Sequence, residues 1–578
     1  MCELIFYLYR SWDFDYKMSN SGIVIVSDVP DTKYTGKQKG QEMHKISFYY
    51  TFVFWFIILS LHCFSQNVNS PNELQISIED GEYWWGAVVD DGYLQPFTSN
   101  SNYSHDLYGD NKANQIQPFL LSSHGQYVWC EDPFEFSFKN GVLTVTSDSG
   151  RIVHENSPTD LRAAFQHASR TFFPPGGELP AALLFQQPQY NTWIELTYDQ
   201  NQEDILEYAR GIVKNGFPPG VLMIDDTWQK DYGTWEFPPD KFPDPEGMMD
   251  ELHDLGFKVM LWMCPFVSPD SPEFRSLREK EALIDNAKTN KPAIIEWWNG
   301  YSAVLDMTHP KAVDWLTENL RHLQKKYNVA GFKFDGGDAY FYTGDIQSYI
   351  PTHANGHMQA WARFGLTFPY NEYRACWKLA GEALAQRLHD KNHNWEDLRQ
   401  LIPNILLQGL IGYAYTCPDM IGGGEYKSFL NLKNVDQELI VRSAQCQALM
   451  PMMQFSVAPW RVLEPDKVDM CREMARLHSR FGEHIISLAK SSAKTGEPII
   501  RSMEYMYPHQ GYATIDDQFM LGEDILIAPV LEKGARSRLV KFPPGKWKDE
   551  QGRTFRGPKG IKVDAPLDKL PWFGKVKK

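Results

Sequence analysis

Carboxylic acids follow several of the segments that read as short buried strands. Hydrolysis of a glycosidic bond requires two carboxyl groups, one protonated beside the leaving oxygen and one ionised beneath the anomeric carbon. Several acids around one site would meet that requirement. The segments are MIDDTW with Asp225 and Asp226, GFKFDGGD with Lys333, Asp335 and Asp338, LHDKNHNW with Asp390, and YTCPDMIGGG with Asp419.

The best placed of these acids is Asp335, which follows an apolar strand and precedes two glycines. Two glycines leave backbone space beside the carboxylate for a ligand. Lys333 lies two residues earlier, on the same face of the strand, where its charge would keep Asp335 ionised. An ordinary turn Asp beside Gly is the structural alternative. For Asp225 and Asp226 the alternative is helix capping, although Trp228, Tyr232 and Trp235 follow closely and offer faces for stacking on sugars.

Other chemistries find less support in the sequence. Asp-Gly-Gly-Asp lacks the alternating ligand spacing of a calcium loop, and His389 and His393 lack the Glu of a zinc protease helix. We find no Ser nucleophile elbow, phosphate-binding loop or dinucleotide fingerprint. We therefore predict neither a metal nor a cofactor.

The order of predicted strands and helices along the chain indicates how these acids are positioned. Hairpin-like alternation with Asn-Gly, Asp-Gly and Ser-Gly turns marks an antiparallel N-terminal β region, and short strands return near the C-terminus. Between them, strands and helices alternate in at least seven units over about 290 residues, which fits a (β/α)8 barrel. The predicted fold class is therefore α/β, a TIM barrel flanked by antiparallel β-sandwich domains. The predicted boundaries are a leader at 1–66, an N-terminal β-sandwich at 67–188, a catalytic barrel at 189–493 and a C-terminal β domain at 494–578.

Residues 43–66 have the layout of a secretory signal peptide: a Met, a Lys, an apolar run and a small residue, Ser65, before Gln66. We expect cleavage near Ser65 and a periplasmic or extracellular protein. An uncleaved membrane anchor is the alternative.

Composition narrows the choice of partners. With 57 Lys and Arg against 73 Asp and Glu, the chain has a net charge of −16, which disfavours nucleic acid and anionic lipid as ligands. Aromatic residues make up 14% of the chain, including 18 Trp, and suit stacking on sugar rings or a large aromatic core. The eight cysteines form no C-x-x-C pair. We expect the six between Cys130 and Cys471 to be buried as small hydrophobes.

From about Asn191 to its end the chain resembles glycoside hydrolase family 31. The resemblance rests on an ordered series of segments: PPGVLMIDDTWQKDYGTWEFPPDKFPDPEGMMDELHDLGFKVMLWMCPFV, WWNGYSAVLDMTHP, GFKFDGGD, DMIGGG and DQFMLGEDILIAPVLEKG. It implies a retaining α-glycosidase with Asp335 as nucleophile and Asp390 as acid and base, because Asp390 lies sixteen residues after Arg374 and ahead of Trp395. That role implies a raised pKa for Asp390. The resemblance also implies substrate-binding roles for Asp225, Trp298, Lys333, Arg374 and Asp419, and more weakly for Asp226, Trp262 and Arg442.

Two departures bear on the substrate. The α-glucosidases of this family usually carry Phe where this chain has Gly423, and His where it has Pro459. The segments KFDGGD, DMIGGG and LMPMMQFSVAPW resemble the branch that contains the myogenesis-regulating glycosidase and α-galactosidase-like bacterial members. We therefore expect an exo-acting enzyme on terminal α-linked sugars, with an α-galactoside-like substrate favoured. An α-glucosidase, an α-xylosidase and a barrel that only binds glycans are the alternatives, and the oligomeric state is left open.

Overall fold

The computed structural model describes residues 17–19, 22–24, 72–430 and 435–577. The short strands β1 (Lys17–Ser19) and β2 (Gly22–Val24) pair with each other and belong to a unit of their own, Met1–Pro71. The predicted signal peptide, 43–66, lies outside the described residues. Residues 72–578 form the second compact unit. No helix in the described ranges combines the length and apolar character needed to cross a membrane.

The N-terminal part of this unit contains two β-sheets, as expected. One sheet is antiparallel, with the order β3-β9-β8-β5, and the other has the order β10-β7-β6-β22, with β4 also paired to β6. The 3-10 helix η2 (Val89–Leu94) and helix α3 (Leu161–Phe172) accompany them. The strands are β3 (Glu73–Ser77), β4 (Trp84–Val88), β5 (Tyr103–Asp106), β6 (Gln115–Ser122), β7 (Tyr127–Trp129), β8 (Glu135–Lys139), β9 (Val142–Thr146) and β10 (Val153–Glu155).

The central sheet is parallel, with the order β24-β23-β21-β19-β13-β12-β11-β25. Its middle strands read VLMI, KVMLWM and GFKF and are almost wholly buried, as parallel strands covered on both faces must be. The strands are β11 (Gln189–Asn191), β12 (Val221–Ile224), β13 (Lys258–Met263), β19 (Gly331–Phe334), β21 (Tyr370–Tyr373), β23 (Gln386–Arg387), β24 (Thr416–Cys417) and β25 (Gln454–Phe455). This is the predicted α/β barrel.

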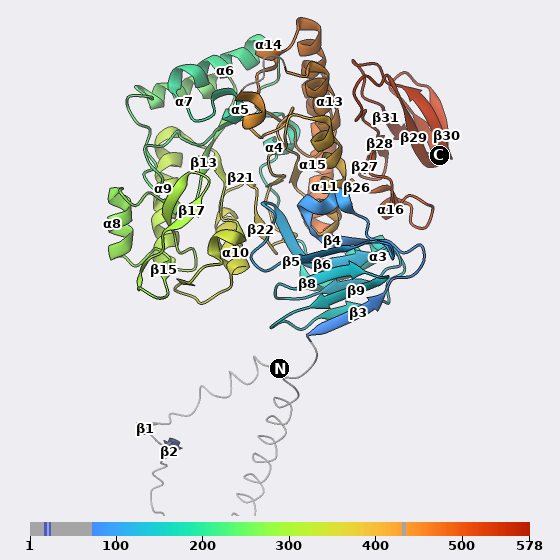
Figure 1. The fold of residues 1–578 in the computed structure, drawn as a ribbon. Helices are drawn as coiled ribbons and strands as arrows, with labels where there is room; N and C mark the ends of the chain where they lie inside the picture. Colours follow the sequence, from blue (N-terminus) through green and yellow to red (C-terminus); the bar gives the residue numbers. More distant parts are fainter. Residues whose placement is uncertain (1–16, 20–21, 25–71, 431–434, 578) are drawn as a thin grey trace, which may run out of the picture. The chain divides into compact units, whose positions relative to one another are not determined.

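Helices follow the strands and lie outside them, as Figure 1 shows for α6, α7 and α9. Several of the helices start at a side chain that caps them: Asn201 accepts from the N–H of Asp204 before α6, and Asn394 accepts from that of Asp397 before α11. The helices are α4 (Leu183–Gln186), α5 (Trp193–Leu196), α6 (Gln202–Lys214), α7 (Pro245–Asp254), α8 (Pro272–Glu279), α9 (Pro310–Tyr327), α10 (Ala354–Gly365), α11 (Trp395–Leu410), α12 (Lys427–Leu430), α13 (Gln437–Gln447), α14 (Pro459–Val462) and α15 (Pro465–Thr495).

Small insertions at the carboxyl ends of the strands complete the barrel region. Two three-stranded sheets have the orders β14-β18-β17 and β16-β15-β20, and the 3-10 helix η3 (Ala339–Tyr342) follows β19. The strands are β14 (Phe266–Val267), β15 (Asp285–Asn286), β16 (Lys291–Pro292), β17 (Ile295–Trp297), β18 (Gly300–Val304) and β20 (Ile346–Gln347).

One insertion joins the barrel to the N-terminal part. Strand β22 (Cys376–Trp377) leaves the barrel directly after β21 and pairs in parallel with β6, with Cys376 opposite Gln115. The N-terminal sheet is thereby hydrogen bonded to the segment that follows Arg374. Positions of side chains on that segment depend on both domains.

The C-terminal part is a six-stranded antiparallel sheet with the order β26-β27-β28-β31-β29-β30. Its longest element is the hairpin of β29 and β30, whose inner face packs Val540, Phe542, Trp547 and Val563 into a separate hydrophobic cluster. The elements are β26 (Ile500–Arg501), α16 (Met503–Met506), β27 (Phe519–Leu521), β28 (Ile525–Ile527), β29 (Ser537–Lys548), β30 (Thr554–Asp564) and β31 (Trp572–Lys575). The six cysteines between Cys130 and Cys471 are free and buried, as expected.

Candidate active site

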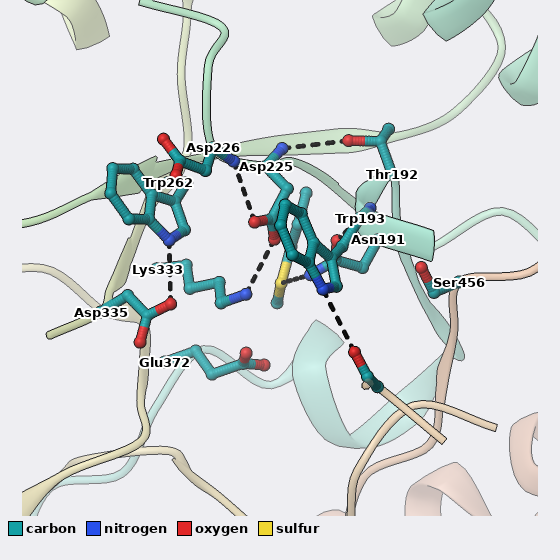
Figure 2. A network of polar contacts seen from close by, with 12 residues as sticks. Asn191, Thr192, Trp193, Asp225, Asp226, Trp262, Lys333, Asp335, Glu372 and Ser456 are labelled. Atoms are coloured by element: carbon teal, nitrogen blue, oxygen red, sulfur yellow. Dashed lines mark hydrogen bonds and ion pairs between the residues drawn. The ribbon is translucent and has the colours of Figure 1, made fainter. Parts of the chain in front are cut away.

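Polar side chains from neighbouring barrel strands meet at the carboxyl ends of β12, β13 and β19 (Figure 2). Asp225 follows β12, Trp262 lies near the end of β13, and Lys333 and Asp335 lie at the end of β19. Parallel strands bring their carboxyl ends to one edge, where barrels place their chemistry. The strands therefore bring together four of the residues predicted from sequence.

Asp335 is held by donors on both oxygens. The indole N–H of Trp262 donates to Oδ2 at 2.9 Å, and the backbone N–H of Gly336 donates to Oδ1 at 3.0 Å. Burial on its own would raise the pKa of Asp335. The charges of Arg374, Lys333 and Arg387 and the Trp262 hydrogen bond outweigh burial and hold that pKa well below its ordinary value. Asp335 is therefore ionised at any physiological pH.

Two glycines form the turn that directly follows Asp335. Gly336 and Gly337 have φ values of +67° and +74°, in the region that side chains disfavour. A Cβ on Gly337 would lie 2.3 Å from Trp361 Cδ1. The two glycines predicted to leave space thus allow the chain to turn directly against a buried Trp.

Arg374 connects Asp335 to a buried acid. Its Nε lies 3.7 Å from Asp335 Oδ1, and its Nη2 donates to Asp338 Oδ2 at 2.5 Å. Asp338 also accepts from the side-chain amide of Asn111 at 2.8 Å, a residue of the N-terminal part. The guanidinium lies over the ring of Trp298, 4.7 Å from its centroid. Trp298 itself is 42% exposed, so it borders the site and leaves part of its face open to solvent.

Asp225 and Lys333 form a buried ion pair, with Nζ 2.8 Å from Oδ2. Burial and the charge of Arg387 lower the pKa of Lys333, but the charges of Asp225, Asp335 and Glu372 together outweigh them and the pKa is raised. Lys333 is therefore protonated at neutral pH. The ion pair links the carboxyl ends of β12 and β19.

Asp226 lies next to Asp225, but protein groups occupy both of its oxygens. Oδ1 accepts from the Thr227 backbone N–H and the Gln229 amide, and Oδ2 accepts from Tyr232 and Asn299. Burial and the charge of Asp225 raise its pKa to about 7, although these hydrogen bonds oppose the shift. With four donors already bound, Asp226 supports the loop around the site and has little capacity left for a sugar hydroxyl.

Asp390 and Asp419 form a pair around Arg387. The guanidinium Nη1 lies 2.6 Å from Asp390 Oδ1 and 3.4 Å from Asp419 Oδ1. Asp419 Oδ2 accepts from the backbone N–H groups of Lys391 and Gly424 at 2.6 and 2.7 Å. Burial and the charge of Asp390 raise the pKa of Asp419 to about 6, against the effect of Arg387 and these N–H groups. The charge of Asp390 thus contributes to the raised pKa of Asp419.

Two buried charges that sequence reasoning missed complete the site. Arg387 ends β23, and its Nε lies 3.3 Å from Oε1 of Glu372, which lies in β21 opposite Lys333. Burial raises the pKa of Glu372, and the charges of Arg387 and Lys333 oppose that shift. A charged residue within an otherwise buried strand is the signal that could have identified both, since YNEYR and AQRLHD contain them.

Arg442, a weaker candidate for substrate binding, contacts the C-terminal domain. This residue lies on α13 and is fully buried, and its guanidinium donates to the backbone carbonyls of Ala535 and Ala565, both at 2.9 Å. Burial lowers its pKa to about 10. Arg442 therefore joins the barrel to the C-terminal domain. In the part of the chain described by the structure, no group of three or more His, Cys, Asp or Glu is arranged to hold a metal ion.

The fold and this cluster of carboxyl groups define a barrel of the type found in glycoside hydrolases. Residues 182–486 match the glycosyl hydrolases family 31 TIM-barrel domain, and residues 496–577 match the glycosyl hydrolase family 31 C-terminal domain. The chain belongs to glycosyl hydrolases family 31. The resemblance seen in the motifs is thus confirmed.

Relatives and solved structures agree with this assignment. The chain is 33% identical to the myogenesis-regulating glycosidase of Mus musculus over 71% of its own length and 59% of that protein. It is 24% identical to α-glucosidase 2 of Bacillus thermoamyloliquefaciens, over 86% of this chain and 67% of that protein. The family 31 dextranase of Flavobacterium johnsoniae has the same fold, with a TM-score of 0.77 at 22% identity over 88% of this chain and 67% of that one. The chain thus spans little more than half of the mouse relative.

The role of Arg442 can be tested by Arg442→Met. We expect the melting temperature to fall by several degrees, since two buried carbonyls lose a charged donor at a cost of about 1–3 kcal/mol. Arg399→Met, at an exposed position on α11, should leave the melting temperature nearly unchanged. Calorimetry measures both melting temperatures. The kcat/KM of Arg442→Met on an aryl glycoside should stay within about threefold of the wild-type value. A raised KM at an unchanged melting temperature would restore Arg442 as a substrate-binding residue.

Proposed function

We propose that the chain is a retaining exo-acting α-glycosidase that forms a covalent glycosyl-enzyme on Asp335. The observation that carries the proposal is that Asp335 and Asp390 have different partners: Asp335 lies beside Arg374, and Asp390 shares Arg387 with a second acid, Asp419. Asp335 is held ionised by Arg374 and Lys333, whereas the pKa of Asp419, which shares Arg387 with Asp390, is raised to about 6. A carboxylate that is kept ionised suits the nucleophile, and a carboxyl group next to a second acid suits the proton donor.

In the first step, an Asp335 oxygen attacks the anomeric carbon while Asp390 gives its proton to the glycosidic oxygen, and the bond from that carbon to the leaving group breaks. In the second step, Asp390 takes a proton from water, the water oxygen attacks the anomeric carbon, and the bond to Asp335 breaks. Two inversions retain the α configuration. Trp262 and Arg374 orient the carboxylate throughout by the contacts described above.

The remaining residues are assigned by their contacts. The ion pair of Asp225 and Lys333 offers a charged oxygen and an ammonium group to sugar hydroxyls, and Trp298 offers an apolar face. Asp419 serves Asp390 through Arg387 and through the backbone of Lys391. An oligosaccharide or glycoside is therefore the substrate class. We retain the proposal that the leader directs the protein to the periplasm or outside the cell.

The glycine at position 423 supports an α-galactoside over an α-glucoside as the proposed substrate. Gly423 has a φ of +106°, and a Cβ there would lie 2.5 Å from the backbone oxygen of Lys391, beside Asp390. The Phe that α-glucosidases of this family usually carry at this position does not fit without displacement of that loop. The mouse relative, at 33% identity, is more similar to this chain than α-glucosidase 2, at 24%, and its name states no sugar.

Asp335→Asn tests the nucleophile. We expect kcat on an activated aryl α-glycoside to fall by at least about 10⁴-fold, because an amide cannot form the glycosyl ester. Asp345→Asn, an exposed site ten residues further on, makes the same chemical change and should retain full activity. Mass spectrometry after treatment with a fluorinated sugar trap should place the adduct on Asp335. An adduct on another residue would refute the assignment.

A panel of nitrophenyl α-glycosides tests the sugar. We expect kcat/KM for the galactoside to exceed that for the glucoside, xyloside and N-acetylgalactosaminide by at least about tenfold, since a buried polar site discriminates strongly when one hydroxyl is misplaced. A preference for the glucoside or xyloside would keep the retaining mechanism and replace the substrate. Equal, slow hydrolysis by the wild type and an Asp335→Asn/Asp390→Asn variant would indicate a barrel that only binds glycans.

A further inference from the structure

An acid of the N-terminal domain lies against the loop that carries Asp390. Asp90, in η2, accepts from Nζ of Lys391 at 2.7 Å and lies 2.8 Å from Nδ1 of His389, both through Oδ1. These two residues flank Asp390 on either side. One carboxylate from another domain thus holds both neighbours of the proposed proton donor.

The position of Asp90 is itself fixed by close packing of η2 on helix α11. The backbone of Gly92 approaches the helix so closely that a Cβ would lie 2.7 Å from the Cα of Asn404. The side chain of Asn404 accepts from the backbone N–H of Tyr93 at 2.9 Å. Helix α11 begins five residues after Asp390, so η2 is anchored to the element that continues the same loop.

Lys391 transmits the contact to the site. Its ammonium group is almost fully buried against Asp90, while its backbone N–H donates to Asp419 at 2.6 Å. Burial raises the pKa of Asp90, but hydrogen bonds and charges from His389 and Lys391 outweigh it and bring that pKa to about 2. Asp90 is therefore charged at working pH.

We propose that Asp90 is a positioning residue for the proton donor: it clamps His389 and Lys391 so that Asp390 points at the glycosidic oxygen. This inference rests on the proposed role of Asp390. Asp90 lies in the N-terminal domain, well before the barrel motifs in the sequence. Its contacts are with the residues beside Asp390, so we expect it to affect proton donation only. Asp335 is held by other groups.

Kinetics with graded leaving groups test the proposal. A glycoside with a poor leaving group, such as phenol, needs the proton, whereas a glycosyl fluoride or 2,4-dinitrophenyl glycoside does not. For Asp90→Asn we expect kcat on the phenyl glycoside to fall at least tenfold, with less than a threefold change on the activated substrates. Lys391→Met, which removes the other half of the contact without leaving a cation unpaired, should give the same pattern.

Asp91→Asn is the matched control. Asp91 is the next residue, but its carboxylate contacts Tyr103 and Lys112 and not the loop of Asp390. It should show no dependence on the leaving group. An equal loss on all substrates for Asp90→Asn, or no loss, would overturn the proposal. Asp390→Ala distinguishes a failure of the Asp90 inference from a failure of the proposed function. A loss of kcat that is larger on the phenyl glycoside than on the activated substrates supports Asp390 as the proton donor. An equal loss of kcat on all substrates would refute the proposed function.

A second inference comes from charge in the C-terminal domain. Although the whole chain has a net charge of −16, residues 533–578 contain fourteen Lys or Arg against four Asp or Glu. Lys546 and Arg556 are exposed and stand directly opposite each other on β29 and β30. Like charges directly opposite in an antiparallel pair are destabilising, so this arrangement carries a cost that a bound anion would relieve.

These two cations line a recess of about 800 Å³ together with Lys575 and Lys577. Lys577 is paired with Asp524, which also lines the recess, at 2.9 Å. Within the described residues, neither Lys546 nor Arg556 forms an ion pair with a carboxylate, whereas Arg553 of the same hairpin pairs with Asp549. The recess thus presents unpaired positive charge.

We infer that this recess binds an acidic polysaccharide that bears sulfate or carboxylate groups. A membrane-binding surface needs several exposed hydrophobic side chains. In residues 494–577 only Leu539 and Val576 are large hydrophobic residues exposed to solvent. Single-stranded nucleic acid is bound on exposed aromatic rings, and Trp547 is fully buried here. A linear polyanion matches cations spaced along two neighbouring strands.

Binding to heparin and to polygalacturonate at 0.15 M salt tests this inference. We expect Lys546→Glu/Arg556→Glu to weaken binding at least tenfold, with hydrolysis of a small aryl glycoside unchanged. Lys559→Glu/Lys562→Glu reverses the same charge on exposed positions of the same hairpin, outside the recess, and should have less than a threefold effect. Equal losses in both variants, binding to anionic vesicles without polysaccharide binding, or no binding by the wild type would each overturn it.

Discussion

Three cations share one site with a larger number of carboxyl groups: Lys333 and Arg387, which are buried, and Arg374, which is partly buried. Charges a few ångströms apart in a poorly solvated interior interact strongly, so these cations cannot keep every carboxyl group ionised. The acids are Asp225, Asp226, Asp335, Asp338, Glu372, Asp390 and Asp419. Their surroundings differ accordingly: the pKa of Asp335 is lowered by the cations beside it, whereas the pKa values of Asp226 and Asp419 are raised by burial and by a neighbouring acid.

The division follows the strands. Lys333 and Arg374 lie on either side of Asp335 and favour its ionised form, whereas Asp419 and Asp390 must share Arg387 with Glu372. Asp226, next to a charged neighbour, has a raised pKa and is confined by four donors. Acids of one residue type thus acquire different properties because the barrel gives them different partners.

The barrel does not position these groups unaided. Asn111 reaches Asp338 from the N-terminal domain, β6 pairs with the strand that follows Arg374, and Asp90 contacts the neighbours of Asp390. Arg442 ties the other side of the barrel to the C-terminal domain through backbone carbonyls. Both flanking domains are therefore part of the structure that holds the site.

The sequence by itself determined the order of the domains, the strand ends that carry Asp225, Lys333 and Asp335, and the family. It could do so because apolar periodicity and turn residues are local properties, and because the carboxyl ends of parallel strands must meet. Only the tertiary structure decided that Arg387 lies between Asp390 and Asp419, that Asp226 already accepts four hydrogen bonds, and that Arg442 donates to the C-terminal domain. Those outcomes depend on contacts between residues far apart in the chain, where no local pattern records which charge will face which.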